Sequence, residues 1–445
     1  KLNISQKKTY YIIVIQLNMN ITMTMTIKKN FLIAVLLIGN LAYAQKSAIF
    51  MGATAHLGNG EKIKNSVISV KDGKIDLVAD LSKIRIDPSA FDTIHKVYGK
   101  HIYPGFILTN TKLGLTEIDQ VRATHDYREA GQINPNINTQ IAYNVQSKII
   151  ETVRTNGVLL TQVTPQGGII SGQSSVMYLG GWNWEDATCK SNDGIHLRWP
   201  SSYYNTGWWG EPGGREKNKK YYERINTITE FLERSYAYYK SDNNMDLKME
   251  SMRGLFSGEK NLYLHANYYN DIIDGIHLCK KLNIKKIVLV GGEDAHKAVA
   301  VLKKNKIPVI IKRVHRLPKN QDSHIDEPYK QAKILSENKI TFAFSYAGDM
   351  EAMGSRNLPF TAGTAVAYGL DYEEAIKALT LSTAKILGID DRLGSLEKGK
   401  EATFFISEGD ALDMTTNKIE SIFIKGSSVS TSNHQSELYE IYKDR

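Results

Sequence analysis

Cysteine is scarce in this chain, since only Cys189 and Cys279 occur among 445 residues. Two cysteines cannot build the disulfide framework of a small secreted domain, and the sequence leaves open whether these two pair. Long apolar runs are lacking as well. The run at residues 31–38 is far shorter than the roughly 20 residues that a membrane-spanning helix needs. The sequence thus excludes disulfide-rich scaffolds and multispan membrane proteins.

Blocks of basic residues are also missing from most of the chain. The formal net charge is +9, but residues 1–44 hold five lysines and no acid, so the remainder carries +4. Without a run of five or six basic residues beyond this start, we expect no nucleic-acid partner. Hydrophobic residues at 42% and charged residues at 23% are typical of a globular protein. At this length they predict one barrel-sized domain and a smaller one.

The start of the chain has the pattern of a secretory signal. A basic segment at residues 26–30 precedes the apolar residues 31–38, and small residues follow up to Ala44. We expect cleavage between Ala44 and Gln45 and export to the periplasm or the extracellular space, without a stable membrane span. A buried N-terminal helix is the alternative. Residues 1–44 are therefore set apart from the fold.

Strand patterns stand at both ends of the mature chain. Residues 66–78 predict a β-hairpin whose turn is Asp72-Gly73. Residues 401–406 and 419–425 near the other end are also strand-like. We expect these segments to pair into one small β-sandwich domain formed from both chain ends.

Strands and helices alternate in the middle of the chain. Strands are predicted at 261–266, 286–291, 307–311 and 340–345, with helices at 271–282, 295–303 and 329–337 between them. This spacing indicates parallel βαβ units, and the length fits a (β/α)8 TIM-like barrel. A further helix is expected from Asp371, closed by Gly388. The predicted domains are a composite β domain of 45–103 and 391–430, the barrel of 104–390 with an insertion at 180–240, and a tail of 431–445.

All the tryptophans fall inside that insertion: Trp182, Trp184, Trp199, Trp208 and Trp209. An aromatic insertion in a barrel can form a wall or lid over a binding pocket. It can equally be a loop that packs its own aromatic rings. The sequence leaves both interpretations open.

Several short motifs resemble the metal-dependent amidohydrolase superfamily, and within it the imidazolonepropionase-like branch. They are the Val-Lys-Asp-Gly-Lys-Ile run of 70–75, Tyr-Pro-Gly-Phe-Ile at 103–107, Leu-Pro-Phe-Thr-Ala-Gly at 358–363 and Gly-Ser-Leu-Glu-Lys-Gly-Lys at 394–400. The resemblance implies a distorted (β/α)8 barrel with a small β domain. It also implies hydrolysis of C–N bonds in small molecules, with one or two divalent metals, usually Zn²⁺, at the C-terminal mouth of the barrel.

The resemblance places Asn110 and Lys112 where the family has a His-x-His pair of metal ligands. Because side chains alternate along a strand, both are expected on one face at the barrel rim. A neutral amide oxygen is a poor zinc ligand, and a protonated lysine repels a metal ion. The sequence therefore predicts that this part of the family's metal site is lost.

The remaining family positions are only partly filled. His265 matches the ligand that ends strand five, whereas Gly291 or Gly292 stands where the next histidine belongs. Asp349 is the candidate for the general base after strand eight. We expect the ammonium of Lys112 to pair with Asp349 in place of a metal. Any metal would bind at His265 and Asp349, with Lys112 and Asp349 as acid and base and Asn110 and His265 contacting substrate.

No other motif supplies a metal or nucleophile. The remaining histidines considered as ligands are scattered without ligand spacing: His101, His125, His196, His315 and His324. His-Glu-x-x-His, Walker, Gly-x-Ser-x-Gly and Cys-x-x-Cys motifs are absent from the sequence. Two functions stay open: an exported hydrolase of C–N bonds in small molecules, or a catalytically inactive ligand-binding or structural member. The latter could form a homo-oligomer, or a hetero-oligomer with an active homologue.

Overall fold

The computed structural model describes residues 47–208, 210–241, 245–319 and 322–445. The predicted signal peptide at 1–44 and its cleavage site lie outside the described residues. Cys189 and Cys279 are both free thiols, which answers the question of their pairing. Among the helices in the described ranges, none has the length and apolar character needed to cross a bilayer.

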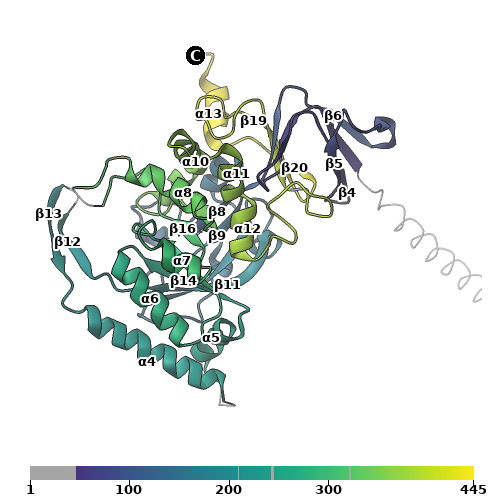
Figure 1. The fold of residues 1–445 in the computed structure, drawn as a ribbon. Coiled ribbons are helices and arrows are strands. Elements are labelled where there is room, and N and C mark those ends of the chain that lie inside the picture. The colour runs from purple at the N-terminus through teal and green to yellow at the C-terminus, as the bar shows by residue number, and fades with distance from the viewer. Residues whose placement is uncertain (1–46, 209, 242–244, 320–321) are drawn as a thin grey trace, which may run out of the picture. The chain divides into compact units, whose positions relative to one another are not determined.

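Two sheets hold the strands near the chain ends, and one of them combines strands from both ends. One sheet has the order β5-β4-β1-β6 and the other the order β20-β19-β18-β7-β2-β3, so late strands pair directly with early ones (Figure 1). The strands are β1 (Ser47–Met51), β2 (Thr54–His56), β3 (Lys62–Ile63), β4 (Ser66–Lys71), β5 (Lys74–Asp80), β6 (Thr93–Lys96), β7 (His101–Pro104), β18 (Phe404–Ser407), β19 (Ile419–Ile424) and β20 (Ser427–Val429). The rings of Phe50, Phe404 and Phe423 pack together in their core. The predicted hairpin is β4–β5, and Asp72 and Gly73 both have the positive φ that its tight turn requires.

The middle of the chain forms an eight-stranded sheet whose strands follow one another in chain order. They are β8 (Phe106–Thr111), β9 (Val158–Val163), β10 (Ile170–Tyr178), β11 (Thr188–Arg198), β14 (Asn261–Ala266), β15 (Ile287–Gly291), β16 (Val309–Ile311) and β17 (Phe342–Phe344). A parallel bridge from Thr109 to Ser345 joins the first strand to the last. The predicted TIM-like barrel with a terminal β domain is confirmed. It is distorted, because β10 runs antiparallel to both of its neighbours.

Helices follow the later barrel strands as the sequence predicts. The helices are α2 (Lys148–Arg154), α3 (Trp184–Ala187), α4 (Tyr221–Tyr239), α5 (Leu247–Ser257), α6 (Tyr269–Lys281), α7 (Val299–Lys304), α8 (Glu327–Glu337), α9 (Glu351–Gly354), α10 (Leu358–Ala367), α11 (Tyr372–Leu379), α12 (Leu381–Leu387) and α13 (His434–Tyr442). Short 3-10 turns are η1 (Pro88–Ala90), η2 (Arg122–Thr124), η3 (Gln140–Ala142) and η4 (Ser355–Asn357). The single helix expected from Asp371 to Gly388 is two helices, because Thr380 leaves the helical conformation between them.

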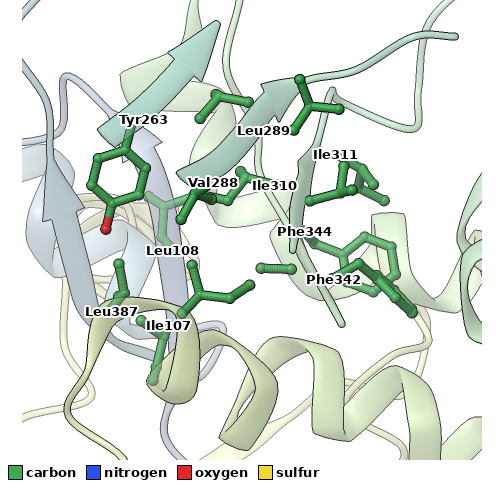
Figure 2. Packing of buried hydrophobic residues seen from close by; sticks show 14 of the residues in the cluster. Ile107, Leu108, Tyr263, Val288, Leu289, Ile310, Ile311, Phe342, Phe344 and Leu387 are labelled. Atoms are coloured by element: carbon green, nitrogen blue, oxygen red, sulfur yellow. The ribbon is translucent and has the colours of Figure 1, made fainter. Parts of the chain in front are cut away.

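The barrel strands and their covering helices share one apolar core. Figure 2 shows Leu108, Val288 and Ile310 from three strands packed near Tyr263. Leu387 of α12 lies beside Ile107 in the same view. These side chains are almost fully buried, which fixes the strand positions that carry the polar groups described below.

The aromatic insertion contains a two-stranded hairpin of β12 (Tyr203–Trp208) and β13 (Glu211–Lys217), followed by α4. Trp199 is buried, and its indole nitrogen donates a hydrogen bond to the Tyr221 hydroxyl (3.2 Å). Trp182 and Trp208 are instead exposed, by 80% and 57%. The insertion thus packs part of its aromatic side chains and leaves part on the surface.

Candidate functional site

The carboxyl ends of β11 and β14 bring a histidine pair and an arginine together. In the parallel register Arg198 lies opposite His265, and His196 lies opposite Tyr263. The His196 Nδ1 and His265 Nε2 atoms are 2.8 Å apart, so one ring donates a hydrogen bond to the other. Since active sites of such barrels lie at the carboxyl ends of the strands, these residues mark the mouth.

Both imidazoles of this pair are held neutral. Burial lowers the pKa of His196 and of His265 well below the ordinary value of 6.5, and the guanidinium of Arg198 lowers both further. His196 Nε2 is buried and has no hydrogen-bond partner among the described residues. The two rings are therefore uncharged and not fully hydrogen-bonded, and they lie beside the guanidinium of Arg198.

One side-chain nitrogen of Arg198 has no acceptor in the part of the chain that the structure describes. Its Nε atom is buried without a hydrogen-bond partner, and within the described ranges no carboxylate lies within ion-pair distance of its guanidinium. Glu351 is the acidic group that acts on it electrostatically. An N–H donor that is buried without an acceptor is unfavourable.

The common face expected for Asn110 and Lys112 assumes regular strand geometry between them. Asn110 has a φ of +51°, and the pairing of β8 with β9 shifts register between Leu108 and Thr111, which interrupts the alternation of side chains. Asn110 remains buried at the mouth, where its main-chain nitrogen donates to Gln162 Oε1 (3.2 Å).

The expected ion pair between Lys112 and Asp349 is also not formed. Lys112 Nζ lies 3.4 Å from Asp119 Oδ1 and 4.8 Å from the centre of the Tyr127 ring. Asp349 is exposed, and Arg313 Nη2 donates to its main-chain oxygen (2.8 Å) rather than to its carboxylate. Positive φ values at Gly348 and Met350 turn the chain here, so that Asp349 faces solvent.

The carboxylate that does lie in the mouth belongs to Glu351, at the start of α9. It is 2% exposed and accepts hydrogen bonds from Lys112 N (2.7 Å), Gln166 Nε2 (3.1 Å) and Gly348 N (3.0 Å). Burial raises its pKa, and Lys112 opposes that rise. Glu351 ties the loop after β17 to the end of β8.

The end of β15 has no room for the missing histidine. Gly291 has a φ of +89°, and a Cβ atom added there would lie 2.5 Å from Asn267 Oδ1. A side chain at this position would be strained and would clash with Asn267. Restoring a ligand at Gly291 therefore requires Asn267 to move.

The residues present do not fit the divalent metal that the resemblance implies. In the part of the chain that the structure describes, no three His, Cys, Asp or Glu side chains are grouped so that they could hold an ion. The Nε2 atom of His265 is engaged with His196, and Arg198 places a positive charge beside it. A cation at this point repels a second cation, which disfavours a divalent metal beside His265.

A second polar cluster lies deeper in the barrel and is fully bonded. Asp193 accepts from Ser174 Oγ (2.6 Å), from Gln162 Nε2 (2.9 Å) and from the Tyr263 hydroxyl. Asn261 Nδ2 donates in turn to the Tyr263 oxygen (3.1 Å). Burial raises the pKa of Asp193, and its three donors oppose the rise.

Sequence reasoning misses Arg198, Glu351 and Asp193. The segment 194–198 follows strand alternation, which puts His196 and Arg198 on one face, so this signal is available once the segment is taken as a barrel strand. Glu351 has no such signal. Its position depends on a turn that reverses the direction of the loop.

Comparisons with known proteins agree with this architecture. A sequence model described as the amidohydrolase family matches residues 247–429. An imidazolonepropionase of Flavobacterium psychrophilum is 29% identical over 174 residues, 37% of this chain and 39% of that protein. An imidazolonepropionase of Thermoplasma volcanium is 27% identical over 178 residues, 38% of this chain and 41% of that protein. The matches thus span about two-fifths of the length of these relatives.

Solved structures share the fold over most of the chain. A crystal structure of an amidohydrolase from Thermotoga maritima MSB8 superposes with a TM-score of 0.72 at 23% identity, covering 86% of this chain and 99% of that one. A Xaa-Pro dipeptidase with bound methionine in its active site gives a TM-score of 0.53 at 12% identity, covering 86% of this chain and 100% of that one. At these identities the likeness establishes the fold.

Proposed function

We propose that this chain is a member of the amidohydrolase superfamily, in its imidazolonepropionase-like branch, and that the mouth of its barrel binds a small carboxylate-bearing molecule. We further propose that it binds this molecule without the metal centre typical of the family. The observation that carries the proposal is the half-buried side chain of Arg198, whose buried Nε has no acceptor among the residues that the structure describes.

The chemistry of Arg198 supports a carboxylate ligand. A guanidinium offers two parallel N–H donors that match a carboxylate in a bidentate pair, and such charge-assisted bonds are among the strongest that proteins form. The imidazolonepropionases similar to this chain are named for an imidazolonepropionate, and a propionate carries a carboxylate. The neutral ring of His265, opposite Arg198 in the sheet, is suited to a hydrogen bond with an uncharged polar group of the ligand.

Hydrolysis of a C–N bond in such a molecule is the second candidate. The family match over 247–429 favours it, and Glu351 supplies a buried carboxyl whose raised pKa suits proton transfer. The roles of Lys112 and Asp349 as acid and base stay predictions. The contacts of Asn110 and His265 with substrate also stay predictions. Of these, Asp349 is displaced toward solvent, so Glu351 is better placed for this role.

Export and partners stay proposals that rest on the sequence. Cleavage between Ala44 and Gln45 predicts a mature periplasmic or extracellular protein. N-terminal sequencing of the protein recovered outside the cytoplasm tests this, and a start far from Gln45 contradicts it. Assembly with a second copy or with an active homologue is tested by mass measurement of the purified complex.

The binding proposal is tested with imidazole-4-propionate as the probe and its methyl ester as the uncharged control. Calorimetry is performed after dialysis against a chelator, with metal content measured on the same sample. We expect the acid to bind, the ester to bind at least about tenfold more weakly, and Arg198→Gln to lose a similar factor. Arg224→Gln, on the exposed face of α4, is the matched control and leaves binding unchanged.

Two outcomes contradict the proposal. One is about one tightly held Zn²⁺ per chain that His265→Ala removes. The other is equal affinity for the acid and its ester. Turnover of a panel of small amides and cyclic imides by the chelated protein, lost in Glu351→Gln, would favour the hydrolase instead.

A further inference from the structure

A large cavity lies at the end of the barrel opposite to the mouth. Its volume is about 780 Å³, and it is bounded by α2, the end of β10 and the strands β19 and β20. Tyr178, at the end of β10, pairs with Leu160 near the start of β9, which places the cavity beside the amino ends of the parallel strands. A cavity of this volume accommodates a ligand of ordinary metabolite or drug size.

One wall of the cavity is apolar. It is formed by the side chains Val145, Ile150, Leu179, Ile424 and Val429. Ile150 and Leu179 are almost fully buried in the barrel core, so this wall is anchored rather than mobile. A ligand that fills the cavity therefore needs an apolar part.

The charges lining the cavity do not cancel. Lys148 pairs with Glu151 across one turn of α2 (3.5 Å), so their opposite charges offset each other in the net charge of the lining. Asp186 accepts a hydrogen bond from the main-chain nitrogen of Trp182 (3.2 Å). Arg154 and Lys425 remain against the single carboxylate of Asp186, so three cations and two carboxylates give the lining a net charge of +1, and within the described ranges neither Arg154 nor Lys425 lies within ion-pair distance of a carboxylate.

Arg154 is held in place but not satisfied. Its Nη1 donates to the main-chain oxygen of Leu179 (2.9 Å), which fixes the guanidinium against the cavity wall. Its Nε is buried and has no acceptor in the described part of the chain. Burial of an N–H donor without an acceptor is unfavourable, so the protein does not fully satisfy this guanidinium.

Lys425 approaches the same cavity from the terminal β domain. Its ammonium lies 4.2 Å from the centre of the Tyr178 ring, a cation–π contact that leaves its N–H donors available. The Tyr178 ring is itself fixed, because its hydroxyl donates to Glu401 Oε2 (2.5 Å). Two cations from two domains thus face one space with an apolar wall.

We propose that this cavity is a second binding site, separate from the barrel mouth, for an amphiphilic carboxylate: one anionic head with a short apolar body. Arg154 and Lys425 bind the head, and the wall at Val145, Ile424 and Val429 contacts the body. Because the ligand contacts the barrel through Arg154 and the β domain through Lys425, it ties the two together.

The test uses sodium octanoate as the probe, well below micelle-forming concentrations, with calorimetry on the chain from Gln45 onward. Octanol tests the need for the charge, and octyl phosphate tests whether the head is a carboxylate or a phosphate. We expect one octanoate per chain, no measurable binding of octanol, and octanoate bound more tightly than octyl phosphate. Absence of octanoate binding, or preference for octanol or octyl phosphate, overturns the proposal.

Variants separate this site from the mouth. Arg154→Gln keeps an amide that can donate to Leu179, yet we expect it to weaken octanoate binding about 10- to 100-fold. Lys425→Gln, at an exposed turn where folding is not at stake, is expected to weaken it about threefold to tenfold. Arg198→Gln at the mouth leaves octanoate binding unchanged. Equal affinity in wild type and both cavity variants, or loss in Arg198→Gln alone, contradicts the second site.

Discussion

Asp193 and Arg198 lie on the same strand, β11, but their surroundings are opposite in kind. Asp193, deep in the barrel, accepts hydrogen bonds from Gln162, Ser174 and Tyr263. Arg198, at the mouth, has a buried Nε without an acceptor. Asp193 is buried, and Arg198 is half-buried. The difference is that the protein supplies every partner in the first case and leaves one open in the second.

This contrast separates structure from function within one barrel. A buried polar cluster that is fully bonded adds rigidity and fixes a unique arrangement. A cluster with orphaned donors is unfavourable for folding, so it is retained where a ligand completes it. The deep cluster around Asp193 is therefore expected to govern stability, and the mouth around Arg198 to govern binding.

Removing Asp193 is expected to have the largest effect. Asp193→Ala leaves the buried Tyr263 hydroxyl without its acceptor, and Gln162 and Ser174 keep only longer bonds (3.2 and 3.4 Å), which should lower the free energy of unfolding by about 3–5 kcal/mol. Urea unfolding followed by circular dichroism measures this. Asp349→Ala, an exposed carboxylate removed in the same way, is the control. If Asp193→Ala lowers the free energy of unfolding by less than about 1 kcal/mol, the expected contrast between the cluster around Asp193 and the mouth around Arg198 is contradicted.

The histidine pair predicts a loss of stability at mildly acidic pH. The pKa values of His196 and His265 are well below 6.5 in the folded protein and return to about 6.5 on unfolding. Their stabilising contribution is thus complete above pH 6.5 and is lost as the pH falls toward the folded values, because only the unfolded chain takes up the protons. Between pH 7.5 and 5.5 the two together should cost about 2–3 kcal/mol.

The measurement compares unfolding free energies at pH 7.5 and 5.5 in wild type and in the double variant His196→Gln/His265→Gln. Between pH 7.5 and 5.5, we expect the free energy of unfolding of the double variant to fall by about 2–3 kcal/mol less than that of wild type. Asp193 and Glu351 act with the opposite sign, since burial raises their pKa values, and they are present in both proteins. Equal losses in the two proteins would mean that the imidazoles titrate normally in the folded state.

The fold can be predicted from the sequence largely because its signals are local. Alternating strands and helices between 261 and 345 indicate parallel units, and strand β14 falls at the predicted residues 261–266. The antiparallel direction of strand β10 is not predictable in this way, because a run such as 170–178 has the same composition in either direction. Direction is decided by the turns at its ends and by the neighbours it pairs with.

The site is less predictable than the fold. His265 at the mouth, and the absence of a histidine at Gly291, follow from motif spacing along single strands. The partners of Lys112 do not, because Asp119 and Tyr127 come from a loop whose path depends on tertiary packing. Arg198 is important because of the groups that surround it in the fold. The amino-acid composition does not indicate that one of its donors lacks an acceptor.

The turn after β17 allows two nearby carboxylates, Asp349 and Glu351, to be compared, and the expected effects on stability are the smallest of those predicted. Sequence spacing favours Asp349 as the carboxylate of the mouth, whereas the positive φ values of Gly348 and Met350 put Glu351 there instead. Asp349→Asn should change stability by less than about 0.5 kcal/mol, as is usual for exposed sites. Glu351→Gln should cost about 1–3 kcal/mol, because an amide replaces a carboxylate that accepts from Lys112 N, Gln166 and Gly348 N. Unfolding and imidazole-4-propionate binding are measured on both variants. A larger effect from Asp349→Asn than from Glu351→Gln would mean that the loop reverses in solution and returns Asp349 to the mouth.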